Sequence, residues 1–434
     1  MSNKISICTL GCRVNAYESL AIADSARALG LEVVEWGERA DFAVVNSCAL
    51  TVLAQAKTRR EIRVFARANP DSPIAVTGCY AQTSPAEAAK LPNVLVVAGN
   101  SKKADVVGML LSADSAKVDV SPAGGWRGKP MSLSAEGFID ERVSLKIQDG
   151  CDNCCSYCII PRARGRPRSR GFDEIMSDAR SLVSRGAREI TLTGINLTKF
   201  SSQERGIVGV IDALDALPGL LRVRLGSVEP QDMPAEALLE RAADPSHKLQ
   251  PHFHVSAQSL CDRVLSAMRR KNTVSEFLAF VARAKSVCPD ISIGADIICG
   301  HPFERDCDYL ETKSAMLSSG LSYAHVFTFS PRPGTPAFSM ASETPDPQTR
   351  RVRSDDLRAA AAGMHMDFMD SQIGKTRPVL FENMLPDGRY MARTDNYVQV
   401  CVSGAGEGLK NTPALARLGG VADSGKMFAS AVRA

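Results

Sequence analysis

The stretch that decides the fold is Gly150–Gly165, which reads GCDNCCSYCIIPRARG. Three of its cysteines, Cys151, Cys155 and Cys158, have the spacing C-x3-C-x2-C. Thiolates are soft ligands that suit iron–sulfur clusters or zinc. Three thiolates can hold three irons of a cubane and leave the fourth iron open, as catalysis requires, whereas structural zinc sites are usually closed by a fourth protein ligand. Because this sequence offers no such ligand nearby at zinc-finger spacing, it favours a catalytic iron–sulfur cluster.

The fourth cysteine of the stretch, Cys154, does not belong to this spacing. If Cys154 were the first ligand, Cys158 would be the second and residue 161 the third, but residue 161 is Pro161. We therefore predict that Cys154 is a spare thiol.

The stretch follows a predicted strand and begins a series of strand–helix units. Predicted helices between the strands include Phe172–Ser184, Asp262–Met268 and Cys307–Leu317. Six such units predict a complete or partial (β/α)6 barrel, whose active site would lie at the C-terminal ends of the strands. The predicted strands are Val143–Gln148, Glu189–Thr193, Arg222–Gly226, Phe253–Ser256, Ser292–Ile297 and His325–Phe329.

The first third of the chain also alternates strands and helices, which predicts a doubly wound parallel sheet in an α/β fold. The expected strands are Ile5–Leu10, Phe42–Asn46, Ile74–Thr77 and Val94–Ala98, and the expected helices are Tyr17–Leu29, Thr51–Ala68, Pro85–Leu91 and Lys103–Leu111.

Three cysteines of this region, Cys12, Cys48 and Cys79, each follow one of the predicted strands. The C-terminal ends of parallel strands lie along one edge of a sheet, so these side chains can converge there. Gly11 and Gly78 precede two of them and would permit tight turns. The alternative is three buried cysteines in unrelated loops. We predict a second metal site.

The remaining segments complete the domain organisation. Residues 113–136 are rich in Ser, Gly, Pro and Lys and have the composition of a linker. The helical pattern Pro347–Ser371 is expected to connect the barrel to a small all-β module, in which Asp387-Gly388 signals a hairpin. The predicted domains are 1–112, 137–372 and 373–434, with the linker between the first two.

The length, composition, net charge and cysteine count of the chain exclude several classes of protein. The 434 residues are 44% hydrophobic and carry a net charge of +4, a mild basicity that permits a nucleic-acid partner without demanding one. Neither a signal peptide nor an apolar run of about 18 residues is visible, so we expect a cytoplasmic protein without a membrane partner. Thirteen cysteines in such a chain indicate metal binding rather than disulfides.

The whole chain resembles the methylthiotransferases, radical S-adenosylmethionine (SAM) enzymes with two clusters. The blocks TLGCRVNAYES, VVNSCAL, VTGCYAQ, GCDNCCSYCIIPRARG, LTGINL, GSVEP, HFHVSAQSLCDRVLSAMRR, DIICGHPFE, FSPRPGTPA and TDNYVQV carry the resemblance. It implies SAM and two [4Fe–4S] clusters, one on Cys151, Cys155 and Cys158 and one on Cys12, Cys48 and Cys79. It also implies a C-terminal TRAM domain. A few blocks differ from the family pattern, for example at Phe303, where the family usually has Gly.

Within the family, TLGCRVNAYES, LTGINL and the short C-terminal module look most like the branch that modifies N6-threonylcarbamoyladenosine in tRNA. The target would be C2 of the adenine, whose hydrogen is not usefully acidic, so hydrogen-atom abstraction is the expected route. The resemblance implies that the first cluster gives an electron to SAM, the resulting radical takes this hydrogen, and the second cluster supplies sulfur. We expect an electron-donor protein such as flavodoxin or ferredoxin as a partner besides tRNA.

Several residues are predicted to face the bound SAM or the substrate. The resemblance places Tyr157 by the adenine of SAM. Polar residues at the predicted strand ends could contact the cofactor, with Glu229 and Gln258 preferred, or could be loop caps and core partners. These residues are Thr193, Asn196, Glu229, His254, Gln258, Asp296 and Arg332.

Two basic or aromatic groups are candidates for RNA contact. Arg162, Arg164, Arg166, Arg168 and Arg170 alternate after the cysteines, and we predict a mixed role as a substrate-facing rim or solvated loop. Tyr390, Arg393 and Tyr397 could hold an unpaired base, and the tyrosines could equally be core residues.

Other functions remain open on the sequence alone. Within the enzyme class, the alternative substrate is N6-isopentenyladenosine in tRNA. Outside it, the alternatives are a non-enzymatic iron–sulfur electron carrier and a zinc-stabilised RNA-binding protein, although neither would need a full six-unit barrel together with an RNA-binding module.

Overall fold

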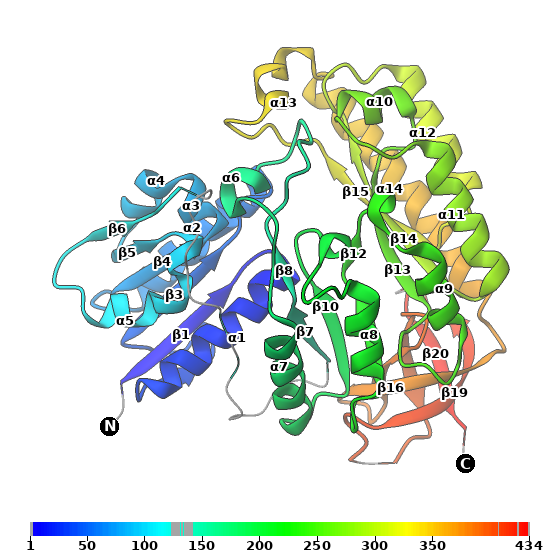
Figure 1. The fold of residues 1–434 in the computed structure, drawn as a ribbon, viewed down its shortest axis with the longest axis horizontal. Coiled ribbons are helices and arrows are strands. Elements are labelled where there is room, and N and C mark those ends of the chain that lie inside the picture. Colours follow the sequence, from blue (N-terminus) through cyan, green and yellow to red (C-terminus); the bar gives the residue numbers. More distant parts are fainter. Residues whose placement is uncertain are drawn as a thin grey trace.

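The computed structural model describes residues 3–122, 131, 133, 142–406, 408–422 and 425–432. Figure 1 shows an N-terminal sheet, a central curved sheet covered by helices, and a small C-terminal barrel. Half of the predicted linker 113–136, namely residues 123–130, 132 and 134–136, lies outside the described residues, as do residues 137–141.

The N-terminal sheet has six parallel strands in the order β2-β1-β3-β4-β5-β6, so the predicted doubly wound sheet is confirmed. Apolar residues of helices α1 and α5 pack against one face, and those of α2 pack against the other. The elements are β1 (Lys4–Thr9), α1 (Arg13–Ala28), β2 (Glu32–Val34), β3 (Phe42–Ser47), α2 (Val52–Ala68), β4 (Ile74–Gly78), α3 (Cys79–Thr83), α4 (Pro85–Ala89), β5 (Val94–Ala98), η1 (Asn100–Asp105), α5 (Val106–Leu111) and β6 (Lys117–Asp119).

Two edge strands, β2 and β6, were not predicted. Each has three residues and none of them is buried, so neither carries the apolar pattern by which a strand is found in a sequence. Strand β6 also begins inside the segment predicted as linker, so that segment starts later than residue 113.

The central part is the predicted partial (β/α)6 barrel, with parallel strands in the orders β11-β10-β7 and β12-β13-β14-β15. The third predicted strand is split into β11 and β12 at Gly226, whose amide donates to the Leu192 carbonyl at 2.8 Å. The strands are β7 (Arg142–Lys146), β8 (Gln148–Asp149), β9 (Arg168–Ser169), β10 (Glu189–Thr193), β11 (Arg222–Leu225), β12 (Ser227–Val228), β13 (His252–Gln258), β14 (Ser292–Cys299) and β15 (Tyr323–Thr328).

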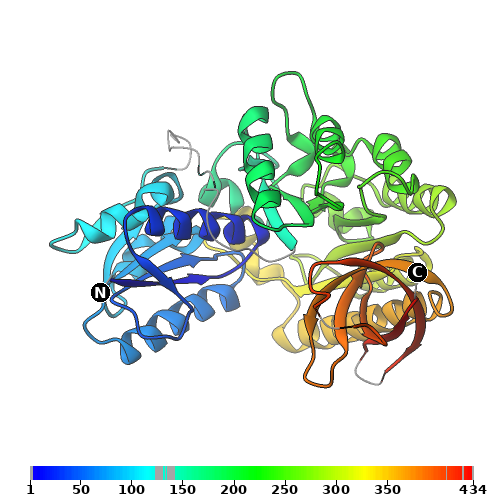
Figure 2. The same cartoon turned by 90° about the horizontal axis from the view of Figure 1, so that it is seen from below.

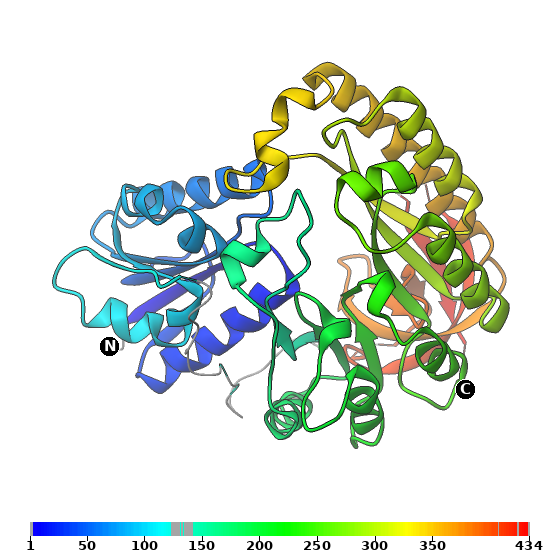
Figure 3. The same cartoon turned by 45° about the horizontal axis from the view of Figure 1, so that its top comes forward.

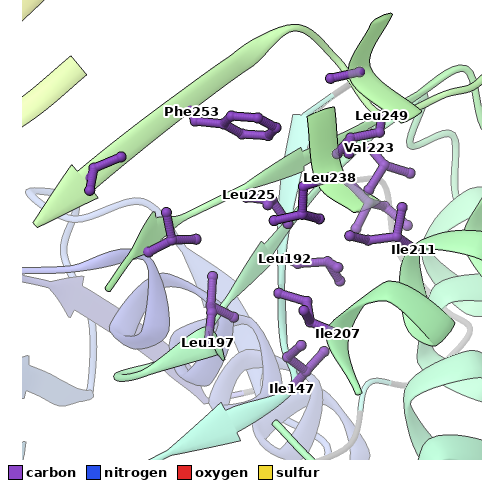
Figure 4. Close-up of a cluster of buried hydrophobic side chains, with 14 of the residues drawn as sticks. Ile147, Leu192, Leu197, Ile207, Ile211, Val223, Leu225, Leu238, Leu249 and Phe253 are labelled. Atoms are coloured by element: carbon purple, nitrogen blue, oxygen red, sulfur yellow. The ribbon is translucent and has the colours of Figure 1, made fainter. Parts of the chain in front are cut away.

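The helices of this part cover the outside of the curved sheet, which Figure 3 shows with its top turned forward. Figure 4 shows the core between sheet and helices, where Leu192 and Leu225 of the strands meet Ile207 and Ile211 of α8. The helices are α6 (Ile160–Arg164), α7 (Phe172–Ser184), η3 (Leu197–Lys199), α8 (Ile207–Asp215), η4 (Pro230–Asp232), α9 (Ala235–Ala243), α10 (Asp262–Ala267), α11 (Val274–Val287), α12 (Asp306–Ser318), α13 (Pro336–Ser339), η5 (Ala341–Glu343) and α14 (Pro347–Asp370).

The C-terminal part is a closed five-stranded barrel in the order β16-β17-β18-β20-β19. Helix α14 connects it to the central part, because Leu357 and Met364 lie in the core of the central part while Phe368 and Met369 lie in that of the small barrel. Figure 2 shows this barrel beside the central strands. Its strands are β16 (Thr376–Met384), β17 (Tyr390–Thr394), β18 (Gln399–Ser403), β19 (Pro413–Val421) and β20 (Met427–Ala431).

Among the described residues, no helix has the length and apolarity needed to cross a membrane.

Candidate active site

The cysteine-rich loop follows β8 and is fixed at both ends. Gly150 has a φ of +73°, and a side chain there would collide with the Arg166 carbonyl, so only glycine suits the turn. The Cys151 amide donates to the Gly165 carbonyl at 3.0 Å. Ser156 binds the end of α10, through its amide to Met268 at 3.0 Å and its hydroxyl to Ala267 at 2.9 Å. These bonds hold the loop in one shape.

Cys151, Cys155 and Cys158 lie together in this loop. Burial raises the pKa of the Cys158 thiol to about 12, and the neighbouring Cys155 and Cys151 act in the same direction. The cation Arg270 lies close, with its Nη1 3.8 Å from the Cys155 Sγ. Cys154 is exposed, and its thiol donates to the Asp152 carbonyl of its own loop at 3.6 Å.

Cys12, Cys48 and Cys79 follow β1, β3 and β4 and line one cavity. Burial raises the pKa of the Cys48 thiol to about 11, and Cys79 and Cys12 contribute as neighbours. Gly11 has a φ of +100°, and a Cβ there would lie 2.9 Å from the Cys48 Sγ. A larger residue would therefore fill the space between the thiols.

Buried polar residues brace the three loops that carry these cysteines. The Asn15 side chain donates to the carbonyls of Leu10 and Ser47, at 2.7 and 3.1 Å. Asn46 donates back to the Asn15 carbonyl at 2.9 Å, and the Ser47 hydroxyl donates to the Thr77 carbonyl. Sequence reasoning missed these residues, although Asn46 and Ser47 directly precede Cys48.

A buried network of charges lies behind the second cysteine set. Arg164 is fully buried, and its guanidinium contacts Glu18 at 3.0 Å and Asp149 at 3.1 Å. Lys103 and Lys146 also bind Glu18. With Arg168, which pairs with Asp149, four cations face two carboxylates. Cys79 and Cys12 are among the groups that raise the Arg164 pKa against the effect of burial.

This network corrects the prediction of an arginine rim. Arg164 is neither solvated nor able to meet RNA, because it is an internal ion-pair partner. Arg168 pairs with Asp149 at 3.2 Å and Arg170 with Asp178 at 2.9 Å. Arg162 and Arg166 are exposed.

A cavity of about 1110 Å³ joins the three parts of the chain. It runs from Cys12, Cys48 and Cys79 to the barrel mouth at Thr193 and Glu229 and on to the loop between β17 and β18 of the small barrel. The thiols of the second set therefore face the same space as the strand ends of the partial barrel.

The predicted SAM-facing residues fall into two groups. Thr193 and Glu229 line the cavity, and the Glu229 Oε2 lies 2.6 Å from the Arg270 Nη2, next to the first cysteine set. Asn196 is buried and accepts from Thr198 at 2.8 Å, and Gln258 sits at a β-bulge with a φ of +69°. Neither of these two lines the cavity.

Tyr157 packs among Cys261, Val264 and Met268, and its ring meets His301 edge-on at 6.4 Å. Arg332 is buried near Cys48, and burial lowers its pKa although that thiol acts in the opposite direction.

The cavity floor carries a linked histidine group. The His254 Nε2 lies 2.9 Å from the Asp296 Oδ1, and the His325 Nδ1 lies 3.6 Å from the same oxygen. Burial raises the Asp296 pKa, but the bonds to His254 and His325 outweigh it and bring the pKa to about 2. Sequence reasoning selected His254 and Asp296 and missed His325, which opens the predicted last strand.

Two family models and several known proteins match this chain. The model of the uncharacterized protein family UPF0004 matches residues 4–99, and that of the radical SAM superfamily matches residues 145–316. The threonylcarbamoyladenosine tRNA methylthiotransferase MtaB of Thermotoga maritima is 36% identical over 91% of this chain and 90% of its own. This chain belongs to the radical SAM tRNA methylthiotransferase family.

Other relatives extend the comparison. The tRNA-2-methylthio-N(6)-dimethylallyladenosine synthase of Zymomonas mobilis is 34% identical over 86% of this chain and 85% of its own. The structure of the radical SAM methyltransferase TsrM of Kitasatospora setae, with tryptophan and a SAM analog bound, has a TM-score of 0.57 at 14% identity and covers 78% of this chain and 75% of that one. The latter likeness shows the fold.

Membership in the methylthiotransferase family implies an enzyme that uses SAM and a [4Fe–4S] cluster. The first cysteine set fits that cluster, since three grouped thiols offer three soft ligands and leave one iron open. Burial raises the pKa of the Cys151 and Cys158 thiols, and metal binding would remove their protons.

Proposed function

We propose that this chain adds a methylthio group to C2 of N6-threonylcarbamoyladenosine next to the anticodon of tRNA, in the cytoplasm, with SAM and two [4Fe–4S] clusters. The observation that carries the proposal is the cavity onto which Cys12, Cys48 and Cys79 open together with the mouth of the radical SAM barrel. Cys151, Cys155 and Cys158 do not line this cavity themselves, but Glu229 does, and its carboxylate lies 2.6 Å from Arg270 next to Cys155. SAM bound beside the first cysteine set would therefore reach the cavity past Glu229.

The two cysteine sets would hold the clusters, with Cys151, Cys155 and Cys158 in one and Cys12, Cys48 and Cys79 in the other. When bound, one cluster with SAM supplies the radical that removes a hydrogen atom, and the other supplies the sulfur. Gly11 leaves room between the thiols of the second set, and Asn15 keeps its loops in register.

The remaining residues would orient SAM and the substrate. Glu229 and Arg270, paired at 2.6 Å beside the first set, suit the amino and carboxylate groups of SAM. Thr193, Asn196, Gln258 and Tyr157 would complete the SAM site. Residues from all three parts of the chain line the cavity.

The choice of substrate rests on the cavity walls as well as on sequence blocks. They carry arginines and histidines, which suit a polar N6 substituent better than an isopentenyl group. An electron-donor protein such as flavodoxin or ferredoxin would supply the reducing electron.

The test is mass spectrometry of tRNA nucleosides from a strain that lacks the gene. We expect 2-methylthio-N6-threonylcarbamoyladenosine to disappear, to return with the wild-type or Cys154→Ala gene, and to stay absent with Cys48→Ala or Cys155→Ala. Loss of the isopentenyl derivative instead would assign the other substrate. Reconstituted protein should bind about eight irons with matching sulfide, and each of the two alanine variants should bind half. Bound zinc without sulfide would refute the enzyme chemistry.

A further inference from the structure

Tyr397, in the loop between β17 and β18, extends from the small barrel into the cavity. Its ring stacks on His252 of β13, with the centroids 4.1 Å apart and the planes 19° apart. Its hydroxyl accepts a hydrogen bond from the Arg13 Nη2 at 3.2 Å. The φ of Tyr397 is +74°, which is costly for a bulky residue and persists only where the surroundings hold it. Tyr397 therefore fixes Arg13, the first residue of α1, at a defined place.

The surroundings of Tyr397 contain more cations than carboxylates. Burial raises the Tyr397 pKa, but the charges of nearby arginines outweigh it and lower the value. Arg142 and Arg393 share the single carboxylate Glu382, each at 3.1 Å, and Arg224 pairs with Glu189 at 2.9 Å.

Arg13 differs from these neighbours. Within the described part of the chain, no carboxylate lies at ion-pair distance from its guanidinium, which is exposed and lines the cavity. A guanidinium held in place, with donors left over and no anion, is suited to an anionic ligand.

The position of Arg13 matches the geometry of the proposed substrate. Arg13 directly follows Cys12 of the second cysteine set. In adenine, C2 and the carbon that carries N6 are separated only by N1 and lie on one edge of the ring. If C2 faces the sulfur-supplying site, the N6 substituent lies along the wall next to it. The threonylcarbamoyl group ends in a carboxylate there, whereas an isopentenyl group offers no hydrogen-bond acceptor.

We propose that Arg13 binds the carboxylate of the N6-threonylcarbamoyl group and thereby selects this substrate over one with an apolar N6 substituent. The inference rests on the proposed function. Arg13 pairs with the carboxylate through its planar guanidinium, and Tyr397 orients it. A substrate without the carboxylate cannot form this pair, so selection comes from a bond that only the threonylcarbamoyl group can make.

The test compares reconstituted wild-type enzyme with Arg13→Gln and Arg13→Lys on anticodon stem–loop RNAs that carry N6-threonylcarbamoyladenosine, N6-isopentenyladenosine or adenosine. For the first RNA we expect Arg13→Gln to raise KM at least about tenfold, as for loss of a charge-assisted bond. Binding of the other two RNAs, measured by fluorescence anisotropy, should change less than twofold. The KM of Arg13→Lys for the first RNA should lie between those of wild type and Arg13→Gln, because lysine keeps the charge but lacks the paired N–H donors of a guanidinium.

Arg27→Gln is the matched control, since Arg27 lies in the last turn of the same helix, far from the cavity lining, and carries the same charge. Iron and sulfide content and the electron paramagnetic resonance spectrum of Arg13→Gln should equal those of wild type, and a loss of iron would assign Arg13 to support of the cluster. Equal weakening on all three RNAs would assign it to general phosphate contact. Either result overturns the inference.

Failure of the proposed function has a different signature. Wild-type enzyme would then act on the isopentenyl RNA and leave the threonylcarbamoyl RNA unmodified, whatever residue stands at position 13. If wild type modifies the threonylcarbamoyl RNA and Arg13→Gln does so equally well, the proposed function stands and the role of Arg13 is refuted.

Discussion

Arg164 of the cysteine-rich loop and Glu18 of helix α1 form an ion pair inside the protein, with contacts of 3.0 and 3.2 Å and side-chain exposures of 0% and 1%. The pair connects the N-terminal sheet to the central barrel and lies behind Cys12 and Cys79. Arg164 also donates to the Asn15 side chain at 2.6 Å, so one guanidinium links the loops of both cysteine sets.

Replacing Glu18 with Gln should strongly destabilise the protein. The change removes the carboxylate that pairs with the buried Lys103 and leaves Lys146 and Arg164 with Asp149. Breaking a buried pair costs about 3–5 kcal/mol. The urea midpoint followed by circular dichroism should fall accordingly. The double variant Glu18→Gln/Arg164→Met should lose less than the sum of the single variants, because it removes the stranded charge as well.

Glu32→Gln is the control for that experiment. Glu32 pairs with Lys4 at 3.8 Å, and both side chains are about half exposed, so the midpoint should hardly move. If Glu18→Gln and Glu32→Gln lowered the urea midpoint equally, the buried network would contribute no more to stability than the exposed Glu32–Lys4 pair.

Gly11→Ala should remove the second set of bound irons and leave the first. Its Cβ would lie 2.9 Å from the Cys48 Sγ and 2.8 Å from the Cys48 Cβ, so the Cys48 side chain must shift from its place. Iron and sulfide analysis after anaerobic reconstitution should give about half the wild-type content. Gly30→Ala carries a similar backbone strain, at φ +80° against +100°, but its Cβ meets nothing within 4 Å, so it should retain full iron. Iron loss in both variants would point to strain and not to crowding.

Glu229→Gln should weaken SAM binding by about 10- to 100-fold, because a carboxylate that bonds to a charged group contributes roughly 1.5–3 kcal/mol. Equilibrium dialysis with SAM measures the effect on cluster-loaded protein. Glu236→Gln on α9 is the matched variant, since Glu236 forms a comparable bond to Arg283 at 2.9 Å on the surface. Unchanged affinity in Glu229→Gln would remove Glu229 from the SAM site.

His301 should make the protein less stable in mild acid. Burial lowers its pKa from 6.5 to about 4, and its Nε2 lies 3.0 Å from the Ser156 hydroxyl of the cysteine-rich loop. Between these two pKa values the unfolded chain binds a proton that the folded chain does not, so stability falls as the pH falls. From pH 7 to pH 5 wild type should lose about 2 kcal/mol more than His301→Gln. Urea unfolding at the two pH values measures this difference, and parallel losses would contradict the prediction.

The features that depend on strand order could be predicted from the sequence. Cys12, Cys48 and Cys79 could be placed together because parallel strands end at one edge, whatever the details of packing. Arg164 could not be placed, because its role depends on Glu18, which is 146 residues away in the chain. A run of arginines in the sequence does not indicate whether the side chains are solvated or pair with a buried carboxylate.

Tyr397 illustrates the same limit. Its neighbours come from α1, β13 and its own barrel, and no local pattern specifies that meeting. Tyr390, by contrast, is a core residue that packs on Phe381 at 5.2 Å, one of the two outcomes expected from its place in an alternating strand.

The loop that carries Tyr397 has a consequence for the order in which the enzyme is made. Both cysteine sets lie within the first 158 residues, whereas this wall of the cavity comes from residues 393–399. A chain still on the ribosome thus has all six cysteines that we propose as metal ligands before this wall of the cavity is synthesised. We therefore expect that a truncated chain without the C-terminal barrel could still offer both cysteine sets to iron, but would lack the cavity wall that Tyr397 provides.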